Sequence, residues 1–158
     1  MEPLRIRPLE AEDVAQVSAV LGLSRLDQAD GVYLVAWEGR SPVGHAHLAL
    51  TDPPELQDVE VRPERRRGGV ASALAAGAED LAAEHGADRV RLLVSADDVA
   101  VRRLYASLGY VDTGIAPLRV RGTVMLRTGP LEVDDTLLTW EKRLPPRPRP
   151  DHESGLAR

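Results

Sequence analysis

Residues 61–74 read VRPERRRGGVASAL, and this stretch decides how the middle of the chain folds. Val59 and Val61 are β-branched residues at strand spacing, and Pro63 ends the strand because it has no N–H to donate. Two adjacent glycines allow a tight turn, and apolar residues then recur at helical spacing. The stretch therefore predicts a strand, a glycine turn and a helix that begins directly after the turn.

The start of this helix is a favourable place for an anion. The first N–H groups of a helix have no acceptor within it and lie at the positive end of the helix dipole, so they favour a phosphate group. Arg65, Arg66 and Arg67 add positive charge just before Gly68 and Gly69. We therefore expect an anion-binding cradle at this turn.

Two common phosphate-binding patterns do not fit the cradle. The nucleotide P-loop needs a lysine after its last glycine, and Lys142 is the only lysine in the chain. The dinucleotide pattern G-x-G-x-x-G is absent as well, because Gly68 and Gly69 are adjacent. A solvated basic loop without a ligand is the ordinary interpretation of such a charge run. A second pattern is therefore needed to decide between a solvated loop and an anion-binding cradle.

That second pattern follows downstream and consists of an acidic residue, a helical stripe and a glycine–tyrosine pair: Asp98, Val101, Leu104, Tyr105, Leu108, Gly109 and Tyr110. Three apolar residues in it are spaced i, i+3 and i+7, which predicts one buried face of a helix. Gly109 is well placed to be the left-handed cap just past the end of that helix.

Both patterns resemble one known family. Arg66, Gly69 and Ala71 spell R-x-x-G-x-A, which resembles the pyrophosphate-binding signature of the GNAT acetyltransferase superfamily. Residues 98–110 resemble the N-x-x-A-x-x-x-Y-x-x-x-G-[FY] helix of the same superfamily, in the same order and at a matching distance. The resemblance implies an α/β (α+β) fold with a central mixed, mostly antiparallel sheet flanked by helices, in which a splayed pair of parallel strands holds acetyl-CoA.

The resemblance also implies which residues bind acetyl-CoA as a co-substrate. Backbone groups of Val59 and Val61 are expected to pair with the pantetheine amides as an added strand would. The pyrophosphate is expected to lie on a continuous run of residues: Arg66, Arg67, Gly68, Gly69, Val70, Ala71 and Ser72. Asp98 stands where the family usually has Asn, so it can accept a hydrogen bond from the pantetheine but cannot donate one.

Acetyl transfer to an amine needs a neutral amine and a proton for the departing thiolate. Tyr105 matches the family's tyrosine and is the expected acid as well as part of the cofactor site, with a tyrosine that only packs as the alternative. Glu55 is the expected base because its side-chain parity matches that of the two strand valines, whereas Asp58 and Glu60 have the opposite parity. A β-bulge in this strand would reverse the parity argument, and a solvated carboxylate is the alternative for Glu55.

The remaining elements follow from periodicity and turn residues. Strands are expected at residues 4–7, 33–37, 42–50, 55–61 and 89–94, and helices at residues 14–21, 70–85 and 99–108. Two extended stretches, 111–126 and 136–143, are expected to complete the sheet on either side of a break with the sequence TGPLEVDD. Residues 1–144 are expected to form one acetyltransferase domain, and residues 145–158 a disordered tail with many prolines and few apolar side chains.

Composition excludes several classes of protein. The 158 residues suffice for one domain, and the hydrophobic fraction of 43% without any Phe predicts an aliphatic core. The absence of Cys excludes a thiol nucleophile, a thiolate metal site and disulfides. No metal site is expected, because the histidines lack metal-ligand spacing; His45 and His47 share a strand face, but hydrogen-bonded side chains are the expectation for both.

The charge and composition of the chain indicate which binding partners to expect. A net charge of −5 and an aromatic fraction of 3% disfavour nucleic-acid binding, and no segment has the length or apolarity of a membrane span or signal peptide. A cytoplasmic protein with no membrane partner is expected.

The expected function is transfer of an acetyl group from acetyl-CoA to a primary amine on a small-molecule or peptide acceptor. The sequence carries no signature for the identity of that acceptor. The alternative is a non-catalytic acyl-CoA-binding sensor or assembly module of the same fold. The resemblance is also compatible with a homodimer.

Overall fold

A computed structural model of the chain describes residues 3–126 and 128–146. Its strands are β1 (Leu4–Pro8), β2 (Gly31–Glu38), β3 (Ser41–Ala49), β4 (Glu55–Val61), β5 (Arg89–Ser95), β6 (Val111–Asp112), β7 (Leu118–Leu126) and β8 (Gly129–Arg143). Its α-helices are α1 (Val14–Ser18), α2 (Val70–Glu84) and α3 (Val99–Ser107), and two single 3-10 turns are η1 (Ala11–Asp13) and η2 (Pro63–Arg65).

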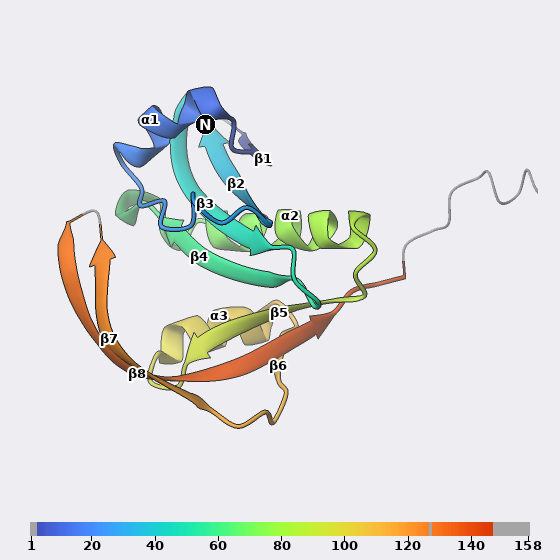
Figure 1. The fold of residues 1–158 in the computed structure, drawn as a ribbon. Coiled ribbons are helices and arrows are strands. Elements are labelled where there is room, and N and C mark those ends of the chain that lie inside the picture. Colours follow the sequence, from blue (N-terminus) through green and yellow to red (C-terminus); the bar gives the residue numbers. More distant parts are fainter. Residues whose placement is uncertain (1–2, 127, 147–158) are drawn as a thin grey trace, which may run out of the picture.

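The strands of these described ranges form one eight-stranded sheet in the order β1-β2-β3-β4-β5-β8-β6, with β7 paired to β8. Every neighbouring pair is antiparallel except β4 and β5, which run parallel. Figure 1 shows the two halves of the sheet diverging between β4 and β5. The predicted mixed, mostly antiparallel sheet with one parallel pair is therefore confirmed.

Helix α2 covers one face of the first half of the sheet. Its buried side chains pack with those of β2 to β5 in the main hydrophobic cluster: Val70, Leu74, Ala75, Ala78 and Ala82. On the opposite face, Val17 and Leu21 pack against Val35 and Trp37 in a smaller cluster next to α1. Valine, leucine and alanine dominate both clusters, as the composition predicts, and each fully buried Val or Leu contributes about 1.5–3 kcal/mol to stability.

The ends of α2 and α3 form as the sequence predicts. Gly69 directly precedes α2 with φ of 84°, and Gly109 follows α3 with φ of 100°, a left-handed conformation that glycine adopts without a Cβ penalty. At the start of α3 the carboxylate of Asp98 accepts a hydrogen bond of 3.0 Å from the backbone N–H of Val101. Asp98 therefore acts as a helix N-cap.

The C-terminal part of the sheet corrects one prediction. The sequence predicts a break at residues 128–135, but β8 runs through this segment, while residues 113–117 lie outside any strand. The aspartates that suggest a turn are satisfied within the strand: Asp134 pairs with Arg119 and Arg121 of β7, and Asp135 accepts a hydrogen bond from Ser95. Pro130 is tolerated because it lies beside the end of a hairpin rather than inside a sheet.

Most of the tail predicted to be disordered, residues 147–158, lies outside the described residues. That prediction and the proposed domain boundary therefore stay predictions. In the described part of the chain, no helix has the length and apolar character needed to cross a membrane.

A close contact between β2 and β3 allows a test of the packing. A Cβ added to Gly31 would lie 2.2 Å from Cε1 and Nε2 of His47, whose side chain is 1% exposed. Because the imidazole cannot move without disturbing the core, Gly31→Ala should lower the free energy of unfolding by about 1–3 kcal/mol, measured by urea denaturation. In a His47→Ala background the same change should cost less, because only the approach of 3.2 Å to the backbone oxygen of Leu48 remains, and an equal penalty in both backgrounds would contradict the contact with His47.

Candidate active site

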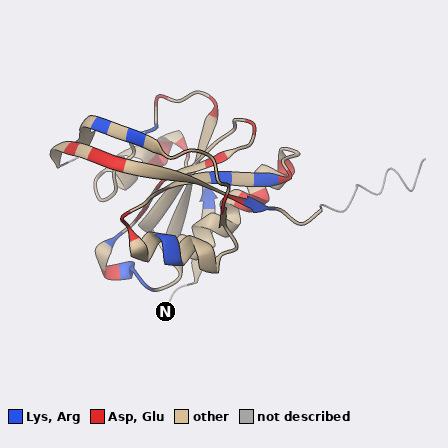
Figure 2. Cartoon of the chain, turned by 90° about the horizontal axis from the view of Figure 1, so that it is seen from below, with Lys and Arg blue, Asp and Glu red and all other residues tan. Residues whose placement is uncertain are grey.

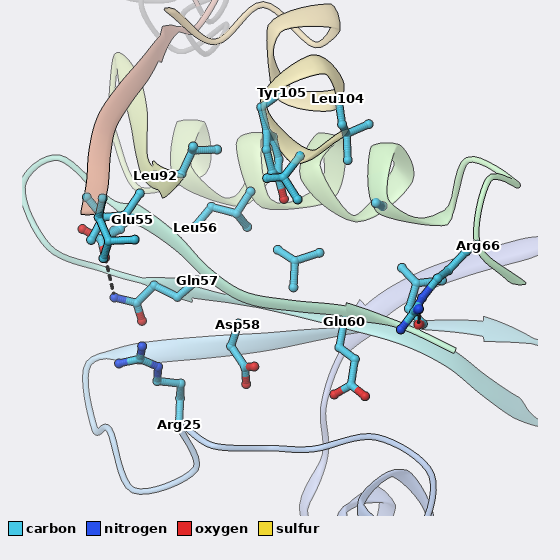
Figure 3. Close-up of a pocket in the computed structure, with 16 residues that line it drawn as sticks. Arg25, Glu55, Leu56, Gln57, Asp58, Glu60, Arg66, Leu92, Leu104 and Tyr105 are labelled. Atoms are coloured by element: carbon cyan, nitrogen blue, oxygen red, sulfur yellow. Dashed lines mark hydrogen bonds between the residues drawn. The ribbon is translucent and has the colours of Figure 1, made fainter. Parts of the chain in front are cut away.

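The parallel pairing of β4 and β5 is very short. Only Glu55 opposite Arg91 and Leu56 opposite Leu92 are in register, and the strands part beyond them. A cleft of about 550 Å³ opens at this point, lined by β4 on one side and by β5 and α3 on the other. Figure 3 shows the side chains that line it, with Tyr105 and Leu104 above β4 and with Asp58 and Glu60 below it.

A β-bulge lies in the middle of β4. Asp58 has φ of 50°, and the register with β3 shifts between the pairs His47 with Gln57 and His45 with Glu60. A bulge inserts one extra residue and so inverts the side-chain alternation that follows it. Val59 consequently packs against the main core, on the same side as Leu56.

The bulge reverses the parity argument for Glu55. Val59 and Val61 both pack against the main core with Leu56, so Glu55 points to the opposite side of the strand from the two valines. The positional argument that separated Glu55 from Glu60 therefore does not hold. Both glutamates line the cleft, and whether Glu55 acts as a base stays a prediction.

The edge of β4 that faces β5 lacks a strand partner beyond Leu56. Arg62, directly after β4, donates its N–H to Val43 of β3, on the side away from β5. Because backbone groups alternate between the two sides of a strand, those of Val59 and Val61 point to the open side that faces β5. The carbonyl oxygen of Val61 already accepts a hydrogen bond of 3.2 Å from Nε of Arg66. Val59 is thus the better placed of the two for pairing with an extended ligand.

The turn before α2 forms a hollow of about 370 Å³ at one end of the cleft. Most of the residues predicted to hold a pyrophosphate line it: Arg66, Arg67, Gly69, Val70, Ala71 and Ser72. The first N–H bonded within this turn is that of Ala73, which donates to Gly69, so the N–H groups of the three preceding helical residues have no intrahelical acceptor. These donors and the two arginines suit an anion.

Two of the predicted cofactor residues lie beside this hollow and not in its lining. Gly68 lines a neighbouring hollow with Pro3 and Glu64 on the other side of the turn. Asp98 caps α3 and contributes to neither the cleft nor the hollow. Arg65, which the sequence placed near the anion, is bound to Glu38 with a distance of 2.6 Å between Nη2 and Oε1.

Tyr105 reaches the cleft from α3. Its side chain is 7% exposed, and its hydroxyl points into the cleft (Figure 3). The ring stands edge-on to that of Tyr110 at 5.7 Å between centroids, and Tyr110 is itself fixed by a hydrogen bond of 2.9 Å to Glu79. Burial raises the pKa of Tyr105 to about 12, so the phenol keeps its proton at neutral pH and can donate it.

Three carboxylates of β4 line the opposite wall, each held by different partners. Glu55 accepts hydrogen bonds from Gln57 at 2.8 Å and from Nε of Arg91 at 3.3 Å. Asp58 accepts a short hydrogen bond of 2.5 Å from the hydroxyl of Tyr33. Glu60 accepts one of 2.8 Å from the N–H of Gly22.

The strand histidines are hydrogen-bonded, in agreement with the sequence-based expectation. Nε2 of His45 is hydrogen-bonded to the carbonyl oxygen of Gly22, and Nδ1 of His47 lies 3.1 Å from the amide oxygen of Gln57. Burial lowers the pKa of His47, which favours the neutral ring. Among residues 3–126 and 128–146, no three His, Asp or Glu side chains gather as they would around a metal ion.

Sequence reasoning missed two walls of the site. Ala100, Val101 and Leu104 of α3 face the anion hollow, although the last two carry the apolar stripe that predicted only core packing. Arg25 and Leu137 complete the cleft on its far side, and neither belongs to a recognisable motif. Only the helical spacing of the α3 stripe could have been used to find part of this lining.

Comparisons with known proteins agree with this geometry. The model of the acetyltransferase (GNAT) family matches residues 5–110. No curated protein matches the chain by sequence. Among solved structures, the chain is similar to the ribosomal-protein-S18-alanine N-acetyltransferase from Escherichia coli, with 16% identity and a TM-score of 0.70 over 92% of this chain and 97% of that chain.

Two further solved structures show the same likeness. An acetyltransferase from Bacillus subtilis in complex with CoA has 18% identity and a TM-score of 0.70, over 90% of this chain and 100% of that chain. The spermidine/spermine N-acetyltransferase from Vibrio cholerae has 15% identity and a TM-score of 0.66, over 89% of this chain and 92% of that chain. At such identities the likeness establishes the fold, whereas the family match covers well over half of the sequence; the chain therefore belongs to the GNAT acetyltransferase family.

Proposed function

We propose that this protein transfers an acetyl group from acetyl-CoA to a primary amine of a small-molecule or peptide acceptor. The observation that carries the proposal is the order of groups along one cleft. An anion-binding helix start lies at one end, the protonated hydroxyl of Tyr105 lies inside, and carboxylates of β4 lie on the opposite wall. Proton donor and proton acceptors thus flank the space where a thioester and an amine would meet.

In this proposal the chain holds acetyl-CoA mainly through backbone groups. The N–H groups of Val70, Ala71 and Ser72, with Arg66 and Arg67 beside them, bind the pyrophosphate. The free edge of β4 at Val59 pairs with the pantetheine as an added strand. Binding of CoA to the Bacillus subtilis relative, which has the same fold, supports this assignment.

Three proton transfers balance the reaction. A carboxylate takes the first proton from the ammonium group of the acceptor, which frees the nitrogen lone pair to form the new bond to the acyl carbon. As the bond between carbon and sulfur breaks, Tyr105 donates its phenolic proton to the departing sulfur, and the second proton lost by the nitrogen returns the phenolate of Tyr105 to its protonated form. The proton held by the carboxylate then passes to solvent. Glu55 is the proposed base, and Glu60 competes with it because the bulge leaves both side chains in the cleft.

The cradle is tested by Gly69→Val. Acetyl-CoA should raise the melting temperature of the parent, because a ligand that binds only the folded state stabilises it. A branched side chain at Gly69 crowds the pyrophosphate and should abolish that rise. Gly86→Val is the matched control, since Gly86 has nearly the same φ, 85° against 84°, at the other end of α2. Equal ligand-induced shifts in all three proteins would contradict the assignment.

The acid is tested by Tyr105→Phe. This variant should lower kcat by ~10²-fold or more and leave the affinity for CoA near the parent value, because the hydroxyl acts as the thiolate departs. Tyr110→Phe keeps the supporting ring but removes a hydroxyl that binds Glu79, so its kcat should stay close to that of the parent. Since the pKa of Tyr105 is about 12, kcat of the parent should not fall between pH 7 and pH 10 through loss of this proton.

The base is tested by comparing Glu55→Gln with Glu60→Gln. Either change keeps the size of the side chain and removes its charge. Loss of the true base should lower kcat/KM at neutral pH by ~10²-fold, with a smaller loss at higher pH where more amine is already neutral. A pH profile of Glu55→Gln that overlays the parent, beside a depressed profile of Glu60→Gln, would move the role to Glu60.

The non-catalytic acyl-CoA-binding module makes a different prediction in the same assays. CoA would still raise the melting temperature, but no thiol would be released with any amine. Tyr105→Phe would then change only stability.

A further inference from the structure

Strands β7 and β8 form a two-stranded ribbon that extends beyond the rest of the sheet (Figure 1). Up to Leu137, β8 pairs only with β7, and from there to Arg143 it pairs with β5. Among the described residues, both outer edges of the ribbon therefore lack a further strand partner.

The two faces of the ribbon differ sharply in polarity. Residues directly opposite each other in an antiparallel pair share a face, so the register assigns every side chain. One face carries Met125, Pro130 and Thr136 together with the charges: Arg119, Arg121, Thr123, Glu132 and Asp134. The other is apolar apart from Asp135: Leu118, Val120, Val124, Leu126, Leu131, Val133 and Leu137.

The charges of the polar face are already paired across the ribbon. Asp134 binds Arg119 at 2.9 Å and Arg121 at 3.4 Å, and Thr123 donates a hydrogen bond of 2.8 Å to Glu132. Figure 2 shows the arginines on one strand of this ribbon beside the acidic residues of the other. Asp135, the exception on the apolar face, accepts a hydrogen bond of 2.8 Å from the hydroxyl of Ser95.

The apolar face is continuous with the candidate active site. Leu137 lines the central cleft together with Tyr105. At the tip of the ribbon, Leu126 of the apolar face and the adjacent Met125 line a second hollow of about 370 Å³ against Leu21 and Leu23. Despite this position the apolar side chains are still about half exposed, at 45% for Leu126 and 52% for Leu118.

The charged residues that line this second hollow are both acidic. Asp58 and Glu60 project into it from β4, and among its described lining residues no basic side chain faces them. Asp58 also lines the central cleft, so the hollow leads directly to the place where an acceptor amine must arrive. An ammonium group is attracted by these carboxylates, whereas the rest of the molecule that carries it meets leucine and methionine.

We propose, on the basis of the acetyl transfer argued above, that the acceptor is a primary amine with a single positive charge on an apolar body, such as an alkylamine or arylalkylamine. The volume of the hollow suits a small molecule rather than a folded protein. Both carboxylates come from β4, so a second charge at the far end of the acceptor, or a body rich in hydroxyl groups, would lie against Leu21, Leu23, Met125 and Leu126 and lose hydration without gaining a partner. Polyamines and amino sugars are therefore rejected by the same wall that holds the apolar body.

The matched probes are n-hexylamine and 1,6-diaminohexane, which have the same length and differ by one terminal charge. With acetyl-CoA saturating, kcat/KM measured by thiol release should be at least ~10-fold higher for n-hexylamine. Glucosamine, with a polar body, should react as poorly as the diamine. A preference for the diamine or for glucosamine would overturn the proposed acceptor class while leaving acetyl transfer to amines intact.

Leu126→Asp places a carboxylate on the apolar wall and should reduce the preference for n-hexylamine by ~5-fold or more, mostly through KM. Val111→Asp is the control, because Val111 is an exposed apolar strand residue of β6 that lines neither the cleft nor the second hollow. The CoA-induced rise in melting temperature should be the same in the parent and both variants, which separates a change in selectivity from a loss of folding or cofactor binding.

The competing occupant of the apolar face is a second copy of the chain. If the parent is a dimer in analytical ultracentrifugation, and Leu126→Asp makes it a monomer with unchanged amine selectivity, the ribbon is an interface and the proposal is overturned. Absence of turnover with every amine would overturn acetyl transfer itself.

Discussion

The site depends on how briefly β4 and β5 pair. Two register positions hold the strands together, and every backbone group of β4 beyond Leu56 on that side is left without a strand partner. The N–H and C=O groups of such an edge need other partners, such as a side chain, water or an extended ligand, and Arg66 already binds the carbonyl oxygen of Val61. The separation creates the cleft, exposes the edge that a pantetheine can pair with, and brings α3 close enough for Tyr105 to enter. A longer parallel ladder between β4 and β5 would close the cleft, cover the free edge of β4 and keep Tyr105 out.

The bulge at Asp58 is the second constraint, because it decides which side chains the cleft receives. Without the extra residue, Val59 would point away from the core and Glu60 would point into it. With it, the apolar side chains stay on the α2 face, and the carboxylates gather on the face that borders the loop after α1. Tyr33 of β2 and Gly22 of the loop after α1 then hold Asp58 and Glu60 by hydrogen bonds.

Local chemistry made much of this fold predictable. Pro63 and Gly69 mark a strand end and a helix start by their backbone restrictions alone, and the helical stripe of α3 is visible in its spacing. The position of a residue relative to distant parts of the chain could not be predicted from the sequence. A bulge is one extra residue in one strand relative to its partner strand, and the side-chain parity assigned to Glu55 was wrong because the bulge in β4 was not known. The strand character of residues 129–135 was hidden too, since Asp134 and Asp135 resemble turn residues until their partners Arg119 and Ser95 are placed. The second hollow, which lies between α1 with its following loop, β4 and the end of β7, is built entirely from such long-range neighbours.

Strand β8 serves two separate tasks along its length. From Leu137 to Arg143 it is an interior strand of the sheet, tied to β5 and to the core, and substitutions there disturb the scaffold. From Gly129 to Thr136 its only strand partner is β7, although Asp135 accepts a hydrogen bond from Ser95 and the carbonyl oxygen of Thr136 accepts one from Ala96. Side chains from Gly129 to Asp134 can therefore change with little effect on the packing of the sheet. Where the ribbon borders the acceptor, as proposed, mutations in this outer half would change acceptor specificity at little cost to stability, and descendants of one such chain could diverge in substrate while keeping the same scaffold.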